Sequence, residues 1–267
     1  MSHRRYVAIG DSQTEGLNDG DEQTGYRGWA DRLAELLAAH EPEFRYANLA
    51  VRGRLTAQIR AEQAPAALAL EPDLVSVMAG MNDLVQPGFD AAAVTADLEA
   101  MLAAFSASGA RVVTFTFPDV GRVIPLARRL RPRVMDFNER IRAAARRHDA
   151  VLVETFEHEV TCDPRLYGAD RLHLGPDGHA RLAAATAHAL GVPGSDASWA
   201  DPLPPLPPAV PWARARTELT WAASFFGPWM VRRLRGRSSG DGRSAKRPQL
   251  QPLHPTHPLP GDGLRTS

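Results

Sequence analysis

The sequence predicts an α/β protein with helices on both faces of a parallel sheet of about five strands, followed by a C-terminal extension. Short apolar runs alternate with longer segments of helical periodicity over residues 1–190. The apolar runs are continuous, as in strands that are buried on both faces. After Leu190 the chain becomes proline-rich and basic. The first two observations predict an open, doubly wound sheet, in which ligands bind at the carboxyl ends of the strands.

Each predicted strand is a short apolar run between polar or turn-forming residues. The five strands are expected over residues 5–9, 44–50, 73–80, 111–117 and 150–156. The helices between and after them have apolar residues at helical spacing, for example Leu33, Leu36 and Leu37 in the first. These helices are expected over residues 29–40, 56–70, 91–108, 132–148 and 176–190. Pro65 is expected to interrupt or bend the second helix.

Composition narrows the class of protein. The chain has 267 residues, 44% of them apolar and 23% charged, which is ordinary for a soluble globular protein. A single cysteine, Cys162, excludes an internal disulfide. The charged N-terminus resembles no signal peptide, and no run of about 18 apolar residues predicts a membrane span. We therefore expect a cytoplasmic protein.

The chain divides into four parts by composition. We expect a catalytic domain over residues 1–195 and a proline-rich linker over residues 196–211, where six prolines fall within residues 201–211. A basic amphipathic helical segment is expected over residues 212–237 and a disordered tail over residues 238–267. Residues 202–267 carry a net charge of +7, which leaves −7 on the first 201 residues.

Four polar segments stand at the ends of predicted strands or directly before a helix. Ser12 follows the first strand in "GDS", Gly53 follows the second in "NLAVRG", and Asn82 follows the third in "GMND". Asp170 and His173 lie in "DRLHLGPDGH", before the last helix. Because the carboxyl ends of parallel strands meet at one edge of a sheet, we expect these side chains to converge there.

Together these residues could perform nucleophilic acyl chemistry. Serine is a weak nucleophile that needs a base within hydrogen-bond reach, and His173 can be that base. Asp170, three residues earlier, can hold the imidazole in one tautomer. The oxyanion formed by attack on a carbonyl needs preorganised donors, and the candidates are the backbone N–H groups of Ser12 and Gly53 and the amide of Asn82.

Taken singly, each segment has a simpler interpretation. "GDS" can be a turn, Asn82 and Asp83 can be a helix N-cap pair, and a loop aspartate and a surface histidine are common. Asp170, His173, Asp177 and His179 could also form a metal cluster, although that would leave the serine and the oxyanion donors unexplained. His179 alone is expected to pack or cap at the start of the last helix. A coincidence of all the simple interpretations, in this order and at strand ends, is improbable.

The chain resembles the SGNH hydrolases, also called GDSL esterases and lipases. The four residues of the family name correspond to Ser12, Gly53, Asn82 and His173, and the resemblance covers about residues 4–190. Gln13 stands where the GDSL motif has leucine. The resemblance implies a flavodoxin-like three-layer α/β/α sandwich. We expect no cofactor and no metal. It implies Ser12 as nucleophile, His173 as base, Asp170 as its orienting partner, and Ser12, Gly53 and Asn82 as the oxyanion hole.

The family acts on several kinds of ester and thioester, and the sequence does not choose among them. The loop over residues 13–28 carries Glu15, Asp19, Asp21 and Glu22, which would not attract an anionic head group. We therefore expect a small acyl ester or an acetylated sugar, cleaved through an acyl-enzyme on Ser12. Alternatives that use the same triad are a thioesterase, a lysophospholipase and an acyltransferase. A catalytically silent binding module is the alternative outside enzymes.

The basic C-terminal segment has three interpretations. Its aromatic and apolar residues can pack against the acidic catalytic domain, which is the interpretation we favour. These residues are Trp212, Leu219, Trp221, Phe225 and Trp229. The segment could instead lie on a membrane surface or bind an acidic partner. Nucleic-acid binding is not expected, because the rest of the chain is acidic and contains no recognition module.

Overall fold

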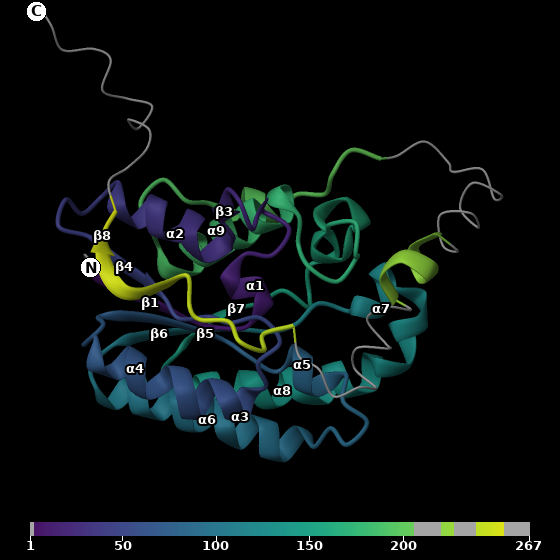
Figure 1. Cartoon of the computed structure of the whole chain (residues 1–267), viewed down its shortest axis with the longest axis horizontal. Coiled ribbons are helices and arrows are strands. Elements are labelled where there is room, and N and C mark those ends of the chain that lie inside the picture. The colour runs from purple at the N-terminus through teal and green to yellow at the C-terminus, as the bar shows by residue number, and fades with distance from the viewer. Residues whose placement is uncertain (1–2, 206–219, 227–238, 254–267) are drawn as a thin grey trace, which may run out of the picture.

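The structure is a computed structural model, and it describes residues 3–205, 220–226 and 239–253. The strands of its central sheet are β1 (Arg5–Gly10), β4 (Arg45–Asn48), β5 (Leu74–Met78), β6 (Arg111–Phe115), β7 (Val151–Val153) and β8 (Arg247–Pro252). Their order across the sheet is β7-β6-β5-β1-β4-β8 (Figure 1). From β7 to β4 all neighbours pair in parallel, so all five predicted strands are confirmed. Counted along the chain, these five strands have the flavodoxin-like order 2-1-3-4-5.

Helices cover both faces of the sheet, which gives the expected three layers (Figure 1). One layer contains α2 (Trp29–Ala38) and α9 (Pro176–Leu190). The other contains α3 (Thr56–Gln58), η1 (Ile59–Gln63), α4 (Ala64–Ala69), α6 (Ala91–Ala107) and α8 (Arg131–Arg147). The shorter elements are α1 (Ser12–Glu15), β2 (Gly20–Asp21), β3 (Gly25–Tyr26), α5 (Met81–Leu84), α7 (Val120–Val123), η2 (Pro125–Leu130), η3 (Glu159–Cys162), η4 (Pro164–Leu166), η5 (Ala197–Ala200) and η6 (Ala222–Phe226). The predicted interruption of the second helix is a π-helical turn, η1, directly before the segment that contains Pro65.

The core lies between the sheet and these two helical layers. Its largest fully buried side chains include Tyr6 on β1, Trp29 on α2, Phe115 on β6 and Phe137 on α8. The Trp29 and Phe115 rings meet edge to face, with centroids 4.8 Å apart. Leu36 departs from the predicted apolar face of its helix, since it is 42% exposed whereas Leu33 and Leu37 are buried. This core fixes the carboxyl edge of the sheet, where the candidate residues lie.

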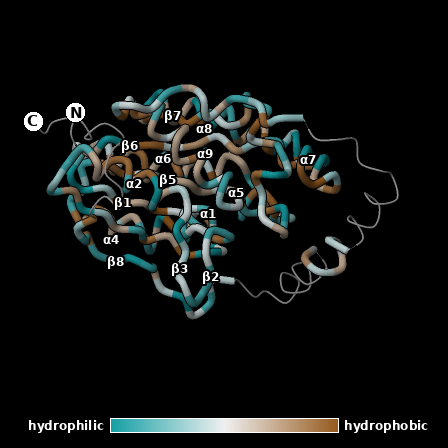
Figure 2. The backbone as a smooth tube through the Cα atoms, turned by 90° about the horizontal axis from the view of Figure 1, so that it is seen from above, coloured by the Kyte–Doolittle hydropathy of each residue, from teal (hydrophilic) through white to brown (hydrophobic). Residues whose placement is uncertain are grey.

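The prediction of disorder over residues 238–267 is wrong for the first half of this range. Residues Arg247–Pro252 form β8, which pairs antiparallel with β4 at the edge of the sheet. The strand is hydrophilic (Figure 2) and has no alternating apolar pattern, so periodicity could not reveal it. Its pairing depends on the open backbone edge of β4, and Leu250 and Leu253 pack against the core. The sheet is therefore mixed, with a sixth strand that was not predicted.

Two other predicted parts of the C-terminal extension are described only partly. In the predicted linker, residues Ala197–Ala200 form η5, and Arg181 of α9 donates hydrogen bonds to Trp199 O and Asp201 O. The linker is thus folded against α9 at its start, and its residues 206–211 lie outside the described residues. Of the predicted segment 212–237, the structure describes residues 220–226, including η6. Among the described helices, none has the length and apolar character that a membrane span requires.

Candidate active site

The candidate nucleophile lies at the point where the strand order of the sheet reverses. Ser12 follows β1, which lies between β4 and β5, and it opens the short helix α1. The turn before it needs glycine, because Gly10 has a φ of 156° and a Cβ there would lie 2.6 Å from Met78 O of β5. Such a switch point is where open α/β sheets bind their ligands. Ser12 itself is only 6% exposed, so its hydroxyl is held in a defined environment.

Ser12, His173 and Asp170 form a continuous hydrogen-bonded triad. Ser12 Oγ lies 2.8 Å from His173 Nε2, and His173 Nδ1 lies 2.7 Å from Asp170 Oδ2. The other carboxylate oxygen, Asp170 Oδ1, accepts the backbone N–H groups of Leu172 and His173, each at 3.0 Å. The carboxylate therefore fixes both the backbone turn and the imidazole of His173.

The environment of Asp170 determines the protonation pattern of the triad. Burial alone would raise the pKa of this carboxyl, but its hydrogen bonds and proximity to His173 lower it to about 2. An ionised carboxylate only accepts hydrogen bonds, so His173 Nδ1 carries a hydrogen. In the neutral imidazole Nε2 is then the acceptor, and the hydroxyl of Ser12 donates to it. This is the tautomer that a general base for Ser12 requires.

Gly53 and Asn82, the other two candidates, reach the same edge of the sheet. Asn82 Nδ2 lies 3.0 Å from Asp11 Oδ2 and 3.1 Å from Arg54 O, so it links the neighbours of Ser12 and Gly53. Gly53 has a φ of 75°, a left-handed conformation that favours glycine. Both hydrogens of the Asn82 amide thus have protein acceptors, and an oxyanion would have to replace one of them.

Asp11 is a buried carboxyl directly before Ser12. It accepts hydrogen bonds from Gln13 N and from Asn82 Nδ2, and it is 3% exposed. Burial raises its pKa to about 6. The carboxyl thus orients Asn82 and caps α1, at the cost of holding a charge in a poorly solvated place at neutral pH.

Gln13 is a site residue that the chemical reasoning missed. Its Nε2 donates to Leu172 O at 3.1 Å, and its Oε1 accepts from Leu174 N at 3.3 Å. These two residues flank His173, so the amide of Gln13 joins the helix of Ser12 to the loop of His173. The departure from leucine at this position was visible in the sequence, but the partners of an amide cannot be inferred from its type.

Two further sets of polar contacts stabilise the end of β1 and the helix of Ser12. Gln63, in the π-helical turn, accepts from Gly10 N and donates to Gly10 O, each at 2.9 Å, and so closes the end of β1. Glu15 accepts the backbone N–H of Arg52 at 2.7 Å and forms a buried ion pair with its guanidinium. Arg52 precedes Gly53, so this pair connects the helix of Ser12 to the loop of Gly53.

The acidic loop over residues 13–28 presents less negative charge than its composition suggests. Glu15 pairs with Arg52, Asp19 with Arg32, and Glu22 with both Arg52 and Arg243, while Asp21 accepts hydrogen bonds within its own turn. The electrostatic argument against an anionic head group therefore has little support in the folded protein.

His179 is a structural residue, as expected. Its Nδ1 accepts the backbone N–H of Trp29 at 3.1 Å, so its Nε2 carries the hydrogen that bonds Leu17 O at 2.9 Å. The metal-cluster alternative is not supported, because the described residues contain no group of three or more His, Cys, Asp or Glu side chains that could hold a metal ion. Asp170 and His173 bind each other, and His179 faces backbone groups.

The burial of His179 predicts a pH dependence of stability. Burial lowers its pKa to about 4, from 6.5. Between these values the unfolded chain binds a proton that the folded protein does not, so the free energy of unfolding decreases as the pH falls from 6.5 to 4. The loss amounts to about 3 kcal/mol. Denaturant unfolding of the wild type and of His179→Gln across this range measures it.

The difference in unfolding free energy between the wild type and His179→Gln isolates the contribution of His179. Asp11 titrates in the same range with the opposite sign, since its pKa is raised, and subtraction removes its contribution. We expect the wild type to lose about 3 kcal/mol more than His179→Gln on acidification. Parallel pH curves for the two proteins would show that His179 is not a buried neutral histidine.

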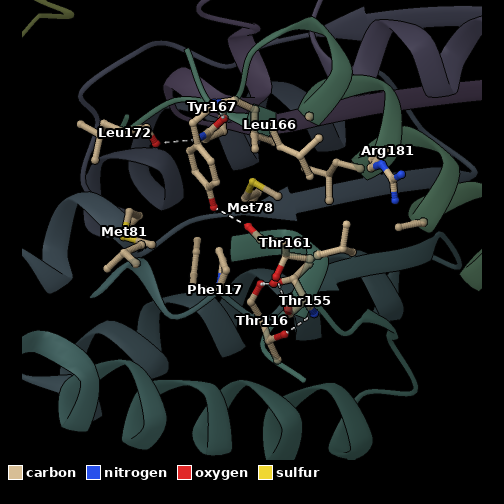
Figure 3. Close-up of a pocket in the computed structure, with 18 of the residues that line it drawn as sticks. Met78, Met81, Thr116, Phe117, Thr155, Thr161, Leu166, Tyr167, Leu172 and Arg181 are labelled. Carbon is tan, nitrogen blue, oxygen red and sulfur yellow. Dashed lines mark hydrogen bonds between the residues drawn. The ribbon is translucent and has the colours of Figure 1, made fainter. Parts of the chain in front are cut away.

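Residues next to Ser12 and His173 in the sequence line an apolar pocket. Figure 3 shows this pocket. Asp11 and Gln13, which flank Ser12, and Leu172 and Leu174, which flank His173, line one end of it. The remaining lining comes from Met78, Met81, Thr116, Phe117, Pro118, Val120, Thr155, Val160, Thr161, Leu166, Tyr167, Gly178, Arg181, Leu182, Ala185 and Trp199. The hydroxyls of this lining bond to protein groups, for example Tyr167 to Thr161 O at 2.7 Å. The pocket therefore offers mainly apolar contacts to a bound group.

Comparison with known proteins settles the family. The model of the GDSL-like lipase/acylhydrolase family matches residues 8–181, which include every residue of the triad. The chain belongs to this family. It is accordingly a carboxylic ester hydrolase with the fold that the sequence predicted. No curated protein matches the chain in sequence.

Several solved structures resemble this chain. TesA is 26% identical with a TM-score of 0.58, and 98% of its length covers 70% of this chain. The acetylxylan esterase Axe2 from Geobacillus stearothermophilus is 21% identical with a TM-score of 0.59, and 94% of its length covers 70%. The α/β-hydrolase enzyme LAE5 from the metagenome of Lake Arreo, Spain, is 22% identical with a TM-score of 0.59, and 95% of its length covers 71%. Nearly the whole of each neighbour thus corresponds to about 70% of this GDSL-family chain.

Proposed function

We propose that this GDSL-family protein cleaves carboxylic esters through an acyl-enzyme on Ser12, and that the apolar pocket beside the triad receives the acyl chain. The observation that carries the first part is the hydrogen-bonded series from Ser12 Oγ through His173 to Asp170, with distances of 2.8 and 2.7 Å. The first contact is within the range that proton transfer to a general base requires, and the second is a hydrogen bond that can orient this base.

In the acylation step, Ser12 Oγ attacks the carbonyl carbon of the ester while its proton moves to His173 Nε2. The Asp170 carboxylate stabilises the imidazolium that forms. The carbonyl oxygen becomes an oxyanion, which the backbone N–H groups of Ser12 and Gly53 and the amide of Asn82 would stabilise. For this, Asn82 turns one N–H from Asp11 or Arg54 to the oxyanion. The imidazolium then protonates the alkoxide, and the alcohol leaves.

In the deacylation step, water replaces the alcohol. His173 Nε2 takes a proton from water, whose oxygen attacks the acyl carbon. Collapse of the second oxyanion breaks the bond to Ser12 Oγ, which regains its proton from the imidazolium. The products are the carboxylic acid and the free enzyme, so no cofactor is consumed. An acceptor alcohol or thiol in place of water would make the same intermediate an acyltransferase.

Covalent labelling tests the nucleophile. A fluorophosphonate should form one adduct on the peptide that contains Ser12, because only a serine activated by a base reacts rapidly with it. Ser12→Ala should abolish both the adduct and the hydrolysis of p-nitrophenyl acetate. An unlabelled wild type without esterase activity would favour the alternative of a silent binding module.

The pocket supports an ester with an apolar acyl chain over an acetyl ester. An acetyl group would leave most of the apolar lining without contacts, whereas each buried methylene contributes about 0.8 kcal/mol. Because these contacts form next to the reacting carbonyl, they can act on the transition state as well as on binding. An acetylated sugar remains the second candidate, since the structural neighbour Axe2 is an acetylxylan esterase.

An acyl-chain series separates these two candidates. With p-nitrophenyl esters, we expect kcat/KM to rise about twofold to fourfold for each of the first methylenes beyond acetate. Leu182→Trp, which adds volume to the pocket lining, should remove this rise. Leu126→Trp is the control, because Leu126 is 48% exposed and is not among the pocket residues. Maximal kcat/KM with acetate in the wild type would favour the acetyl ester.

A further inference from the structure

The C-terminal extension, residues 196–267, reaches the active site from two sides. This extension lies outside the residues that the family model matches, 8–181. One described stretch, residues 220–226, lies near α7 (Figure 1). The other, residues 239–253, runs from the Arg52 loop to the edge strand β8, and a Cβ at Gly240 would lie 2.0 Å from Arg52 O.

Trp221 in the first stretch binds the loop that carries the base. Its indole Nε1–H donates to the backbone carbonyl of Asp170 at 2.9 Å. Its ring belongs to an apolar cluster that includes Ile124, Tyr167 and Leu172. Tyr167 and Leu172 also line the pocket (Figure 3). A side chain from outside the family domain thus contacts the residue that orients the imidazole.

The contact falls where the loop backbone is strained. Arg171, between Asp170 and Leu172, has a φ of 57°, an unfavourable conformation for a residue with a side chain. Such a conformation persists only where neighbouring contacts determine it. The Arg171 guanidinium lies 5.2 Å from the centroid of the Trp221 ring, a cation–π contact. Trp221 therefore contacts both Arg171, which has the strained conformation, and the backbone carbonyl of Asp170 before it.

Lys246 in the second stretch binds the nucleophile helix. It is the only lysine of the chain, and its side chain is 20% exposed. Its Nζ donates to Glu15 O at 2.6 Å, to Tyr26 O at 2.8 Å and to Asp31 Oδ2 at 2.5 Å. Glu15 is the last residue of α1, the helix that Ser12 opens. A cation at this end of the helix also interacts favourably with its carbonyl groups.

We propose that the C-terminal extension completes the active site, with Trp221 positioning the Asp170–His173 loop and Lys246 positioning the helix of Ser12. The proposal rests on the proposed function, because positioning has meaning only if Ser12 and His173 react. Both residues act through others, since neither contacts Ser12 Oγ or the imidazole in any hydrogen bond of the described residues. The extension thus contacts both segments of the triad, the Asp170–His173 loop through Trp221 and the helix of Ser12 through Lys246.

Trp221→Phe removes the hydrogen bond of the indole N–H to Asp170 O and keeps an aromatic ring at this position. We expect it to lower kcat for p-nitrophenyl acetate and the fluorophosphonate labelling rate of Ser12 by the same factor, about 3- to 10-fold, which corresponds to the loss of one hydrogen bond. KM should stay within twofold. Amide hydrogen exchange of residues 168–175 should accelerate, because the Asp170 carbonyl loses its donor. Trp221→Ala should lower kcat and the labelling rate further and should accelerate the exchange of these amides more.

Phe225→Ala is the matched control, since Phe225 lies in the same short stretch and is 40% exposed. It should leave the labelling rate, kcat and exchange unchanged. Wild-type labelling and exchange rates in Trp221→Phe would overturn the role of Trp221, as would equal losses in Phe225→Ala. Labelling reports activation of Ser12 whatever the natural ester is, and exchange reports the loop without any reaction. A failure of the proposed substrate would therefore not be mistaken for a failure of this proposal.

Lys246 requires a test that separates positioning from its ion pair. Lys246→Met should lower the labelling rate about 3- to 10-fold, but it also leaves Asp31 without its cation. Asp31→Asn removes the ion pair and retains the donors to Glu15 O and Tyr26 O, so it should label at the wild-type rate. The double variant should label as slowly as Lys246→Met. Recovery of the wild-type rate in the double variant would overturn the role of Lys246.

Discussion

Replacement of His173 by alanine is expected to lower kcat for p-nitrophenyl acetate by about 10²- to 10⁴-fold, the usual contribution of a general base. His173 Nε2 lies 2.8 Å from Ser12 Oγ, so its loss leaves no group to take the serine proton at that position. The fold should survive, because the half-buried imidazole bonds Asp170 and is not part of the apolar core. Steady-state kinetics and thermal unfolding of the variant measure both effects.

His188→Ala is the matched control, since His188 lies exposed in the last turn of α9. It should keep the wild-type kcat. The assignment of the base would be wrong if His173→Ala retained more than about a tenth of the activity. Added imidazole should restore part of the lost rate, because the small base can enter the space that the side chain leaves.

Asp170→Asn is expected to have an effect of similar size, about 10³- to 10⁴-fold on kcat. The carboxylate accepts from His173 Nδ1 at 2.7 Å and so leaves Nε2 free to accept the proton of Ser12. An asparagine amide that donates to Nδ1 would place the hydrogen on Nε2, which is the wrong tautomer for a base. KM should change little, since Asp170 is not among the pocket residues.

Asp177→Asn controls for the removal of a charge near the site, because Asp177 is an exposed carboxylate in the first turn of α9. Its kcat should equal that of the wild type. Because the pKa of Asp170 is lowered to about 2, the carboxylate stays ionised in the wild type down to strongly acidic pH. Activity of Asp170→Asn within tenfold of the wild type would exclude Asp170 as the orienting residue.

The sheet and its helices were predictable because their signals are local. Buried parallel strands such as Leu74–Met78 read as continuous apolar runs, and helices such as Pro176–Leu190 carry apolar residues at helical spacing. The strand order was not predictable from periodicity and came from the family resemblance. Ser12, Asp170 and His173 could be proposed because a sheet of this class brings strand ends to one edge.

The contacts that hold the triad were not predictable, because they depend on partners far away in the sequence. Gln13 reaches Leu172 and Lys246 reaches Glu15, across 159 and 231 residues. Neither an amide nor a lysine indicates in sequence which carbonyl it will bind. The strand Arg247–Pro252 was missed for a related reason, since its pairing depends on an open backbone edge of β4 and not on its own side chains.

The covalent intermediate is the most direct test of Ser12 as the nucleophile. Rapid acid quenching of the wild type during turnover of a p-nitrophenyl ester, followed by peptide mass spectrometry, should find one acyl group on the peptide that contains Ser12. The acyl group should accumulate in the Asp170→Asn variant if deacylation slows more than acylation, and it should be absent from Ser12→Ala. An acyl group on another residue, or ester hydrolysis by Ser12→Ala at the wild-type rate, would show that Ser12 is not the nucleophile.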